Sequence, residues 1–384
     1  MPHAVVAQDP LKPNWASKLP APSRDRLEKA GIPLDQYPAW PERPSDVKLA
    51  ASVRAGAREH KDPGARADKE KKALFSAAKE VRNLSHHIGT EIIGLQLSQL
   101  TDQQKDELAL LIAERTVVFF RDQDLTPQAQ RDLGAYFGEV EVHPTAAQVP
   151  GLPGVSIIWD ELDPQKAAGK LGFRNHFGTQ DWHTDLTHEK QPPGITHLHN
   201  DTVPDVGGDT FWASGYAAYD HLSPTFRDLI KNLKGVYQSA HAYPNPEDPT
   251  GPRVHIEREH PLVRTHPATG WQSLFVNRKY TIRIAGLEPA ESKLLLEHLF
   301  DVYEKSLDSQ IRFKWTPRTS ALWDNRISIH AAVYDHEGKS ERHGTRVSSL
   351  AEVPYFDASA PTRREALGLD KPEDFVFDRK PSAY

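Results

Sequence analysis

Residues 181–185 read Asp-Trp-His-Thr-Asp, which sets a histidine and a carboxylate two positions apart. On a β-strand, residues i and i+2 project from the same face, so His183 and Asp185 would lie side by side. His330, far along the chain, is the obvious third member of such a group. Two histidines and one carboxylate on one face form the triad that holds non-haem Fe(II) and leaves coordination positions open. The pattern favours a fold in which strands from distant parts of the chain line one cavity.

The chain has 384 residues, a formal net charge of −6 and no cysteine. The lack of cysteine excludes disulfides, thiolate metal sites and cysteine nucleophiles, so any metal must be held by histidine, aspartate or glutamate. The mildly acidic charge gives no reason to expect nucleic acid or an anionic membrane as a partner. No segment of the sequence is typical of a signal peptide or a membrane span. We therefore expect a soluble, cytoplasmic protein that binds a small molecule, and we leave a homo-oligomer open.

The first 80 residues differ in composition from the rest of the chain. Prolines recur between Pro10 and Pro44, and a stretch of mixed charge runs from Arg54 to Lys72. Such a composition buries little apolar surface, which is typical of an extended arm or a disordered tail. We expect residues 1–80 to form a partly extended or disordered arm with a packing role, and residues 81–384 to form the functional domain.

Short apolar or alternating stretches separated by turn residues predict many strands beyond residue 87. Helices are predicted where an N-cap residue precedes an amphipathic run, as at Thr101 with its capping-box partner Gln104, and at Thr126-Pro127. The expected strands are 88–95, 117–120, 155–159, 195–199, 209–212, 321–323 and 346–350, with two more within 262–284, and further helices are expected from 223 and over 288–307. Many short strands with a few helices outside favour an α+β, mainly β fold: a jelly-roll core with surrounding helices.

Two arginines follow the third candidate ligand, since Arg342 and Arg346 lie 12 and 16 residues beyond His330. A guanidinium is the natural bidentate partner of a carboxylate, so an arginine at this place could anchor an acid bound to the metal. Thr210 could donate a hydroxyl hydrogen bond to the same carboxylate. A further same-face pair, His197 and His199, has no accompanying carboxylate and histidine. We interpret these two residues as strand histidines rather than ligands.

Ten short motifs run in one order from about Ile88 to Phe356 and together carry a family resemblance. They are Val118–Gln123, Phe137–Glu139, His143-Pro144, Trp182–Asp185, Pro192-Pro193, Gly207–Thr210, Tyr216–Tyr219, His260–Pro267, Leu274–Asn277 and Trp323–Arg326. With these motifs the sequence resembles the TauD/TfdA family of Fe(II)- and 2-oxoglutarate-dependent dioxygenases, and is most similar in pattern to its taurine and alkylsulfonate dioxygenases. The long N-terminal arm lies outside the bacterial pattern and resembles the longer fungal members.

The resemblance implies a double-stranded β-helix and a complete set of site residues. His183, Asp185 and His330 correspond to the iron ligands, which are also the catalytic centre, while Thr210 and Arg342 correspond to the residues that hold the distal carboxylate of 2-oxoglutarate. Such enzymes use Fe(II), 2-oxoglutarate and O2 to oxidise an unactivated C–H bond, with succinate and CO2 as co-products. Ascorbate is expected to help in vitro.

On the substrate side, the resemblance assigns the grip on a sulfonate to Arg346 and His143, and an aromatic wall to Phe275. Three other pocket positions depart from the taurine dioxygenase pattern: Ala146 replaces a tyrosine, Thr179 an asparagine and Ala242 a serine. The family resemblance thus implies a small anionic substrate, an alkylsulfonate that differs from taurine, hydroxylated next to sulfur with release of sulfite and an aldehyde. A sulfate ester, an amino acid or another carboxylate suits the same grip, and an arginine at 346 argues against a purine.

Two other classes of function remain open at this point. A zinc hydrolase could use the same three ligands with a metal-bound water, although the two anchors for 2-oxoglutarate would then have no purpose. A jelly-roll binding protein without catalysis is the second, and an intact triad is hard to explain on that hypothesis. The exact substrate and the choice between hydroxylation and desaturation are not determined by the sequence.

Overall fold

The computed structural model describes residues 14–41, 44–55, 58–162, 182–336 and 340–369. Its largest element is a seven-stranded sheet in the order β1-β2-β3-β13-β5-β15-β4. The strands are β1 (Glu80–Asn83), β2 (Thr90–Ile93), β3 (Val117–Phe120), β13 (Thr319–Asp324), β5 (Pro193–Thr202), β15 (His343–Leu350) and β4 (Ser156–Trp159). The pair β2 and β3 is parallel, and the other neighbours are antiparallel. Strands far apart in sequence thus lie side by side, as the short-strand pattern predicts.

A three-stranded antiparallel sheet packs against the larger sheet. It has the order β12 (Gln310–Phe313), β6 (Thr210–Ser214) and β14 (Ser328–Ala332). Phe119 of β3 stacks on Phe313 of β12, with ring centroids 3.7 Å apart, and Trp212 of β6 contacts Phe119 edge-on. These rings belong to one fully buried apolar cluster. The layer between the two sheets is therefore a continuous aromatic core.

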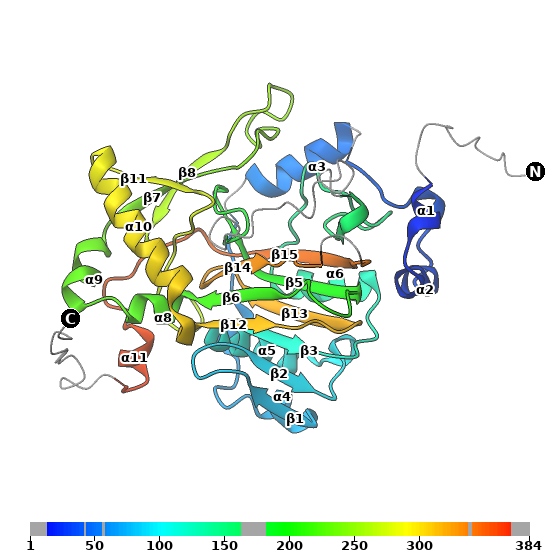
Figure 1. Ribbon diagram of the computed structural model, residues 1–384, viewed down its shortest axis with the longest axis horizontal. Helices are drawn as coiled ribbons and strands as arrows, with labels where there is room; N and C mark the ends of the chain where they lie inside the picture. The colour runs from blue at the N-terminus through cyan, green and yellow to red at the C-terminus, as the bar shows by residue number, and fades with distance from the viewer. Residues whose placement is uncertain (1–13, 42–43, 56–57, 163–181, 337–339, 370–384) are drawn as a thin grey trace, which may run out of the picture.

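The remaining strands lie at one end of the molecule (Figure 1), where α10 (Pro289–Lys305) runs beside them. They are the sheet β11 (Thr281–Ile284), β7 (Lys234–Gln238) and β8 (Glu257–Pro261) and the hairpin β9 (Val263–Thr265) and β10 (Gln272–Leu274). Residues 262–284 therefore hold three strands rather than the two expected, because two short strands of a hairpin precede β11. Shorter helices α8 (Gly215–Asp220), α9 (Pro224–Ile230) and α11 (Arg363–Ala366) complete this end.

Two helices cover the outer face of the large sheet, and both begin where their N-caps predict. Thr101 and Gln104 form the expected capping box at the start of α5 (Asp102–Arg115), and Thr126 caps α6 (Pro127–Phe137) with proline in its first turn. Apolar side chains of these helices bury Val118, Phe120 and Leu322 of the sheet. Burial of this kind stabilises the sheet by about 25 cal/mol for each square ångström of apolar surface removed from water.

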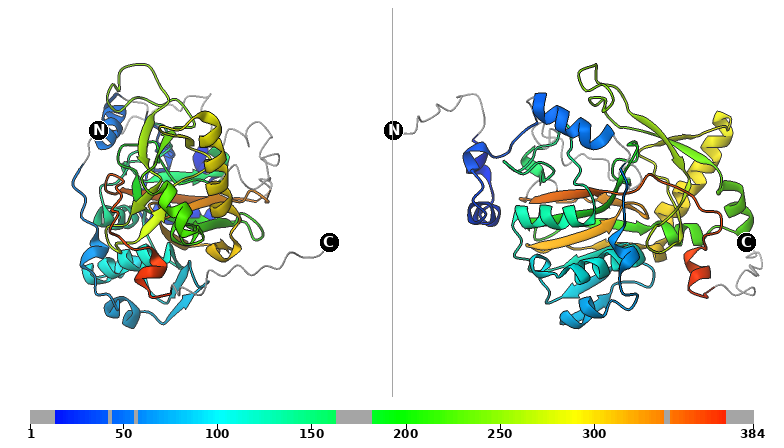
Figure 2. Two further views of the ribbon diagram at one scale, coloured as in Figure 1. Left: turned by 90° about the vertical axis from the view of Figure 1, so that its left-hand side faces the viewer. Right: turned by 180° about the vertical axis from the view of Figure 1, so that it is seen from behind.

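The described part of the N-terminal arm contains four α-helices: α1 (Trp15–Lys18), α2 (Ala21–Lys29), α3 (Pro44–Ala55) and α4 (Lys72–Ala77). Figures 1 and 2 show α1 and α2 at the opposite end of the molecule from α10. Arm side chains bond to the domain, as where the Tyr37 hydroxyl lies 2.6 Å from His343 Nε2. The division of the chain at residue 80 stays a prediction.

The described residues form a mixed fold of helices and substantial sheet. None of the helices in this part of the chain combines the length and apolar character that crossing a bilayer requires.

Candidate metal centre

The backbone brings His183 and His330 together directly. The two residues form an isolated antiparallel bridge, in which His183 N–H donates to His330 C=O at 3.0 Å and His330 N–H donates back at 2.8 Å. His330 lies in β14, but the segment around His183 forms no regular strand. Asp185 begins a turn in which Leu186 has φ +49°. The expectation that the His-x-Asp pair sits on a strand is therefore wrong, although the side chains still meet.

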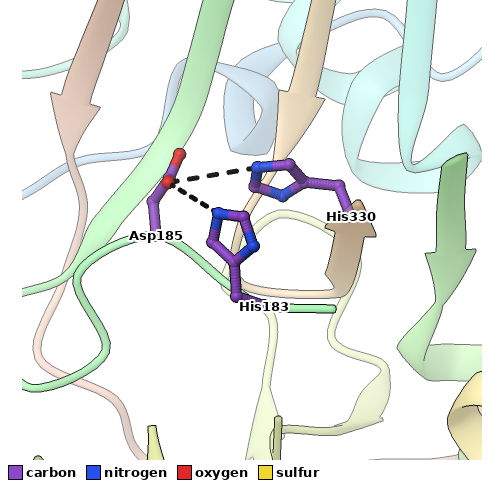
Figure 3. A group of neighbouring side chains, drawn as sticks. All are labelled: His183, Asp185 and His330. Atoms are coloured by element: carbon purple, nitrogen blue, oxygen red, sulfur yellow. Dashed lines mark ion pairs between the residues drawn. The ribbon is translucent and has the colours of Figure 1, made fainter. Parts of the chain in front are cut away.

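The three side chains converge on one point (Figure 3). Asp185 Oδ1 lies 3.6 Å from His183 Nε2 and 4.0 Å from His330 Nε2, and the two imidazole centroids are 4.3 Å apart. One ligand atom from each residue lies within 4.8 Å of the others. The structure thus brings together the whole triad that the sequence predicts, in a geometry that one metal ion can bridge.

The electrostatics of the triad suit a divalent cation. Burial opposes ionisation of Asp185, but Arg346 and the two histidines hold the pKa of its carboxyl well below the usual range. Burial, with the neighbouring His183, lowers the pKa of His330 to about 3. The carboxylate is therefore charged and the His330 imidazole neutral at pH 7, which are the forms that bind metal. Asp185 Oδ2 and His330 Nδ1 have no hydrogen-bond partner among the described residues, so the site keeps bonding capacity.

Backbone and amide groups fix the segment that carries Asp185. The Thr184 hydroxyl donates to Ser328 C=O at 2.7 Å, and Asp185 N–H donates to Asn325 Oδ1 at 3.3 Å. Asn325 is itself held, because its amide donates to Gly194 C=O at 3.0 Å and to the Thr196 hydroxyl at 2.8 Å. Asn325 thus joins the segment of Asp185 to β5.

Of the predicted anion grip, Arg346 contacts the triad, and His143 lies within the electrostatic influence of both Arg346 and Asp185. Arg346 Nη1 is 3.4 Å from Asp185 Oδ1, and a quarter of the Arg346 side chain is exposed. Burial, followed by Arg346 and Arg54, lowers the pKa of His143 to about 3. His143 Nδ1 accepts the backbone N–H of Ala146 at 2.9 Å, so the neutral ring carries its proton on Nε2. That N–H is a donor suited to an oxygen of an anion.

The two predicted anchors for 2-oxoglutarate are both buried. Thr210 lies in β6 opposite Ala332 of β14, and its hydroxyl oxygen accepts a 3.0 Å hydrogen bond from Trp315 Nε1, which leaves its proton free to donate. Arg342 directly precedes β15, and its Nε has no partner in the described part of the chain. Their role in binding 2-oxoglutarate stays a prediction.

The predicted aromatic wall, Phe275, is buried, and its role in the substrate pocket stays a prediction. Its ring lies against Tyr237, and the Arg264 guanidinium carbon sits 4.8 Å from the ring centroid. Two aromatic rings lie beside the triad: that of Tyr280, 6.1 Å from the His183 ring, and that of Trp323, 5.0 Å from the His330 ring. Sequence reasoning missed Tyr280, although the residue comes only three positions after the Leu274–Asn277 motif.

Other predicted pocket positions have mixed outcomes. Ala146 contributes its N–H to His143, and Ala242 precedes Tyr243, whose ring lies 5.5 Å from that of His143. Thr179 lies outside the described residues. The strand histidines, His197 and His199, each lie 3.0 Å from the Ser320 hydroxyl, which bears out their interpretation as structural residues of β5.

Comparison with known proteins adds three relatives. A Schizosaccharomyces pombe protein named putative alpha-ketoglutarate-dependent sulfonate dioxygenase is 37% identical over 80% of this chain and 78% of its own length. A Saccharomyces cerevisiae alpha-ketoglutarate-dependent sulfonate dioxygenase is 34% identical over 92% of this chain and 85% of its own. The crystal structure of a putative alpha-ketoglutarate-dependent taurine dioxygenase from Burkholderia xenovorans superposes with a TM-score of 0.61, at 34% identity, over 72% of this chain and 94% of that one.

The family model described as "Taurine catabolism dioxygenase TauD, TfdA family" matches residues 80–348, more than half of the chain. All three members of the triad, both predicted anchors and both residues of the anion grip fall within this range. The chain belongs to the TauD/TfdA family of dioxygenases.

Proposed function

We propose that this protein is an Fe(II)- and 2-oxoglutarate-dependent dioxygenase that oxidises a sulfonate. The observation that carries the proposal is the convergence of His183, Asp185 and His330 within 4.8 Å, with Arg346 beside them. The names of the two yeast relatives support both the cosubstrate and the substrate class.

We infer that the scaffold is a double-stranded β-helix. Its two halves are the seven-stranded sheet and the sheet β12-β6-β14, which enclose the aromatic core around Trp212. The triad then sits at the end of the smaller sheet, where the His183 segment pairs with β14. A rigid sheet is a suitable support because ligand geometry must be held within about 0.5 Å.

His183 Nε2, His330 Nε2 and one oxygen of Asp185 would hold the iron. When bound, Fe(II) with 2-oxoglutarate and O2 supplies the oxidising power, which amino-acid side chains lack. The protein holds its ligands in their metal-binding forms: the buried His330 resists protonation, and Arg346 keeps Asp185 ionised. Arg342 and the Thr210 hydroxyl would bind the distal carboxylate of 2-oxoglutarate.

Arg346 and His143 Nε2–H would bind the anionic group of the substrate. A charged guanidinium and a neutral N–H donor suit a sulfonate, whose three oxygens accept several hydrogen bonds without taking up a proton. Hydroxylation of the carbon next to sulfur would give an unstable product that releases sulfite and an aldehyde. The same grip accepts a sulfate ester or a carboxylate, so the substrate must be tested directly.

The test is succinate formation by the full-length protein with Fe(II), ascorbate, O2 and 2-oxoglutarate. The panel contains taurine, longer alkyl- and arylsulfonates, an alkyl sulfate, aliphatic amino acids and xanthine. Succinate that depends on a sulfonate and appears with sulfite supports the proposal. Turnover only with carboxylates would retain the metal site and overturn the sulfonate assignment. No succinate with any compound, despite bound iron, would overturn the proposed function on this panel.

A further inference from the structure

The N-terminal arm bonds to the two segments that carry the candidate metal ligands. The first contact comes from Arg54 in α3. Its Nε donates to Glu189 Oε1 at 3.0 Å, its Nη2 contacts the same oxygen, and both side chains are less than 5% exposed. Glu189 lies four residues after Asp185, within the turn that Asp185 begins. This ion pair therefore fastens α3 to the segment of the carboxylate ligand.

A second contact lies just beyond the first. Arg58 N–H donates to Gln191 Oε1 at 2.9 Å, and Gln191 Nε2 donates back to Arg58 C=O at 3.0 Å. Gln191 also donates to Ala351 C=O, directly after β15. The side chain of Gln191 thus ties the arm both to the segment after Asp185 and to the end of the strand that carries Arg346.

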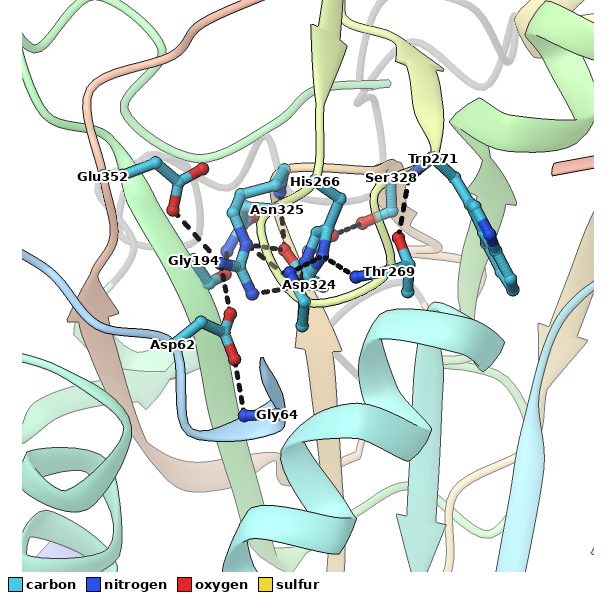
Figure 4. A network of polar contacts seen from close by, with 12 residues as sticks. Asp62, Gly64, Gly194, His266, Thr269, Trp271, Asp324, Asn325, Ser328 and Glu352 are labelled. Carbon is cyan, nitrogen blue, oxygen red and sulfur yellow. Dashed lines mark hydrogen bonds and ion pairs between the residues drawn. The ribbon is translucent and has the colours of Figure 1, made fainter. Parts of the chain in front are cut away.

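A third contact reaches the segment of the distal histidine. Asp62 pairs with Arg326 at 2.5 Å, and Arg326 in turn donates to Asp324 at 2.6 Å (Figure 4). Arg326 lies between β13 and β14, four residues before His330. The Ser328 hydroxyl donates to Asp324 C=O at 2.7 Å, which closes the turn. The arm thus supports both halves of the triad.

The segment after Asp185 needs such support. Leu186 has φ +49°, a left-handed conformation that costs about 1–2 kcal/mol for a residue with a side chain. One local hydrogen bond holds this turn, from Glu189 N–H to Leu186 C=O at 2.9 Å. Residues held in such conformations persist where the surrounding structure fixes them. The Arg54–Glu189 ion pair fixes the carboxyl end of the same turn in this way.

All three contacts come from residues outside the range that the family model matches, 80–348. We propose that the arm is part of the metal centre, and that Arg54 is a positioning residue that sets the place of Asp185 through Glu189. This inference rests on the proposed function, because it assigns the arm a role toward the metal. A buried ion pair contributes little net stability, since its desolvation offsets its attraction, but it does fix geometry. Loss of a group that hydrogen-bonds a metal ligand typically weakens metal binding 10- to 100-fold, and Arg54 acts one step further out, through the turn between Glu189 and Asp185, so we expect an effect near the lower limit.

The test compares Arg54→Met with a matched control, Arg26→Met. Arg26 is also an arm arginine paired with a buried carboxylate of the domain, Asp201 at 3.1 Å, but Asp201 lies in β5, away from both ligand segments. Each full-length protein is titrated with Mn(II) alone, and its thermal midpoint is measured without metal. We expect both variants to melt at lower temperature, and only Arg54→Met to bind Mn(II) about 10-fold or more weakly. Arg54→Lys, which keeps the charge, should recover part of the affinity.

Mn(II) affinities within two-fold of wild type for Arg54→Met, or an equal loss in both variants, would overturn the inference. If Arg54→Met does not fold, Glu189→Gln, which removes the charge from the other side of the same ion pair, is judged against Arg26→Met by the same criterion. A wild-type protein that binds no Mn(II) would overturn the proposed function and this inference with it. Wild-type binding with an unaffected Arg54→Met overturns the inference alone.

Discussion

Two buried clusters lie at opposite ends of the turn between β13 and β14, and their bonding differs. In the first, Asp324 accepts hydrogen bonds from Arg326 and from His266 at 2.9 Å, and Arg326 also pairs with Glu352 at 3.2 Å. Every side-chain oxygen of Asp324 and every side-chain nitrogen of Arg326 has a partner. In the second, the triad, Asp185 Oδ2 and His330 Nδ1 have none among the described residues.

Both clusters contain aspartate and histidine side chains, so their difference in hydrogen bonding distinguishes a structural cluster from a functional one. Buried polar groups are nearly always hydrogen-bonded, so a saturated cluster is explained by the fold alone. The triad, in contrast, keeps an Asp185 oxygen that is unpartnered within the described part of the chain, where three ligand atoms lie within 4.8 Å of one another, an arrangement that a bound metal ion explains. We therefore expect substitutions in the Asp324 cluster to change stability and substitutions in the triad to change activity.

The largest effect is expected for Asp185→Ala, which removes the carboxylate from the triad. Succinate formation should fall to background and Mn(II) binding should be lost, because two histidines alone do not complete the site. The free energy of unfolding should change little, since the ion partners of Asp185 among the described residues are Arg346 and the two histidines. Full turnover by this variant would refute the triad.

Asp324→Ala is the matching substitution in the saturated cluster. This substitution removes the carboxylate that pairs with His266. It also removes one of the three carboxylates that pair with Arg326. We therefore expect the free energy of unfolding to fall by about 3–5 kcal/mol. Urea denaturation of the metal-free protein measures it. Equal losses of stability for Asp185→Ala and Asp324→Ala would remove the distinction between the two clusters.

A smaller effect is expected within the site for Arg346→Ala. Hydrogen bonds to charged groups contribute about 1.5–3 kcal/mol, so the KM for the sulfonate should rise about 10- to 100-fold while the KM for 2-oxoglutarate stays constant. Arg342→Ala is the matched control, and it should raise the KM for 2-oxoglutarate while the KM for the sulfonate stays constant. An unchanged KM for the sulfonate would take Arg346 out of substrate binding.

Local signals explain most of what the sequence predicts correctly. The capping box at Thr101 and the Thr126-Pro127 pair give the starts of α5 and α6, and the apolar run at 117–120 coincides with β3. These features depend on residues within a few positions of one another. The His-x-Asp spacing alone is a weak signal, and the triad is found because the accompanying motifs run in family order along the chain.

Features that depend on distant partners were not predicted. The helices of the arm lie in a proline-rich, charged segment whose composition favours extended chain, and contacts with the domain accompany their formation. Arg54 pairs with a residue 135 positions away, and nothing near it in sequence marks that partner. The turn at Asp185 is likewise set by Asn325 from β13's end rather than by a local strand pattern.

The smallest effect concerns two carboxyl groups, one near each cluster. Burial raises the pKa of Glu141 to about 7, although Arg54 and Arg346 oppose the rise, and one oxygen of Glu141 has no partner among the described residues. The folded protein then keeps this proton at a pH where the unfolded chain has lost it, so ionisation of Glu141 reduces stability as pH rises from 4.5 to 7. Glu141→Gln removes that penalty. Relative to wild type, its free energy of unfolding should increase by about 1 kcal/mol between pH 5 and pH 6.

Glu352, in the saturated cluster, provides the control with the opposite sign. Burial opposes its ionisation, but Arg326 and Arg264 lower its pKa to about 2. Its contribution to stability is present above pH 4.5 and is lost as pH falls toward 2, so Glu352→Gln should destabilise the protein by a constant amount between pH 5 and pH 6. Urea denaturation of wild type and both variants at pH 5 and pH 6 measures these differences in the free energy of unfolding. A constant difference for Glu141→Gln as well would show that Glu141 is already paired and belongs with the structural cluster.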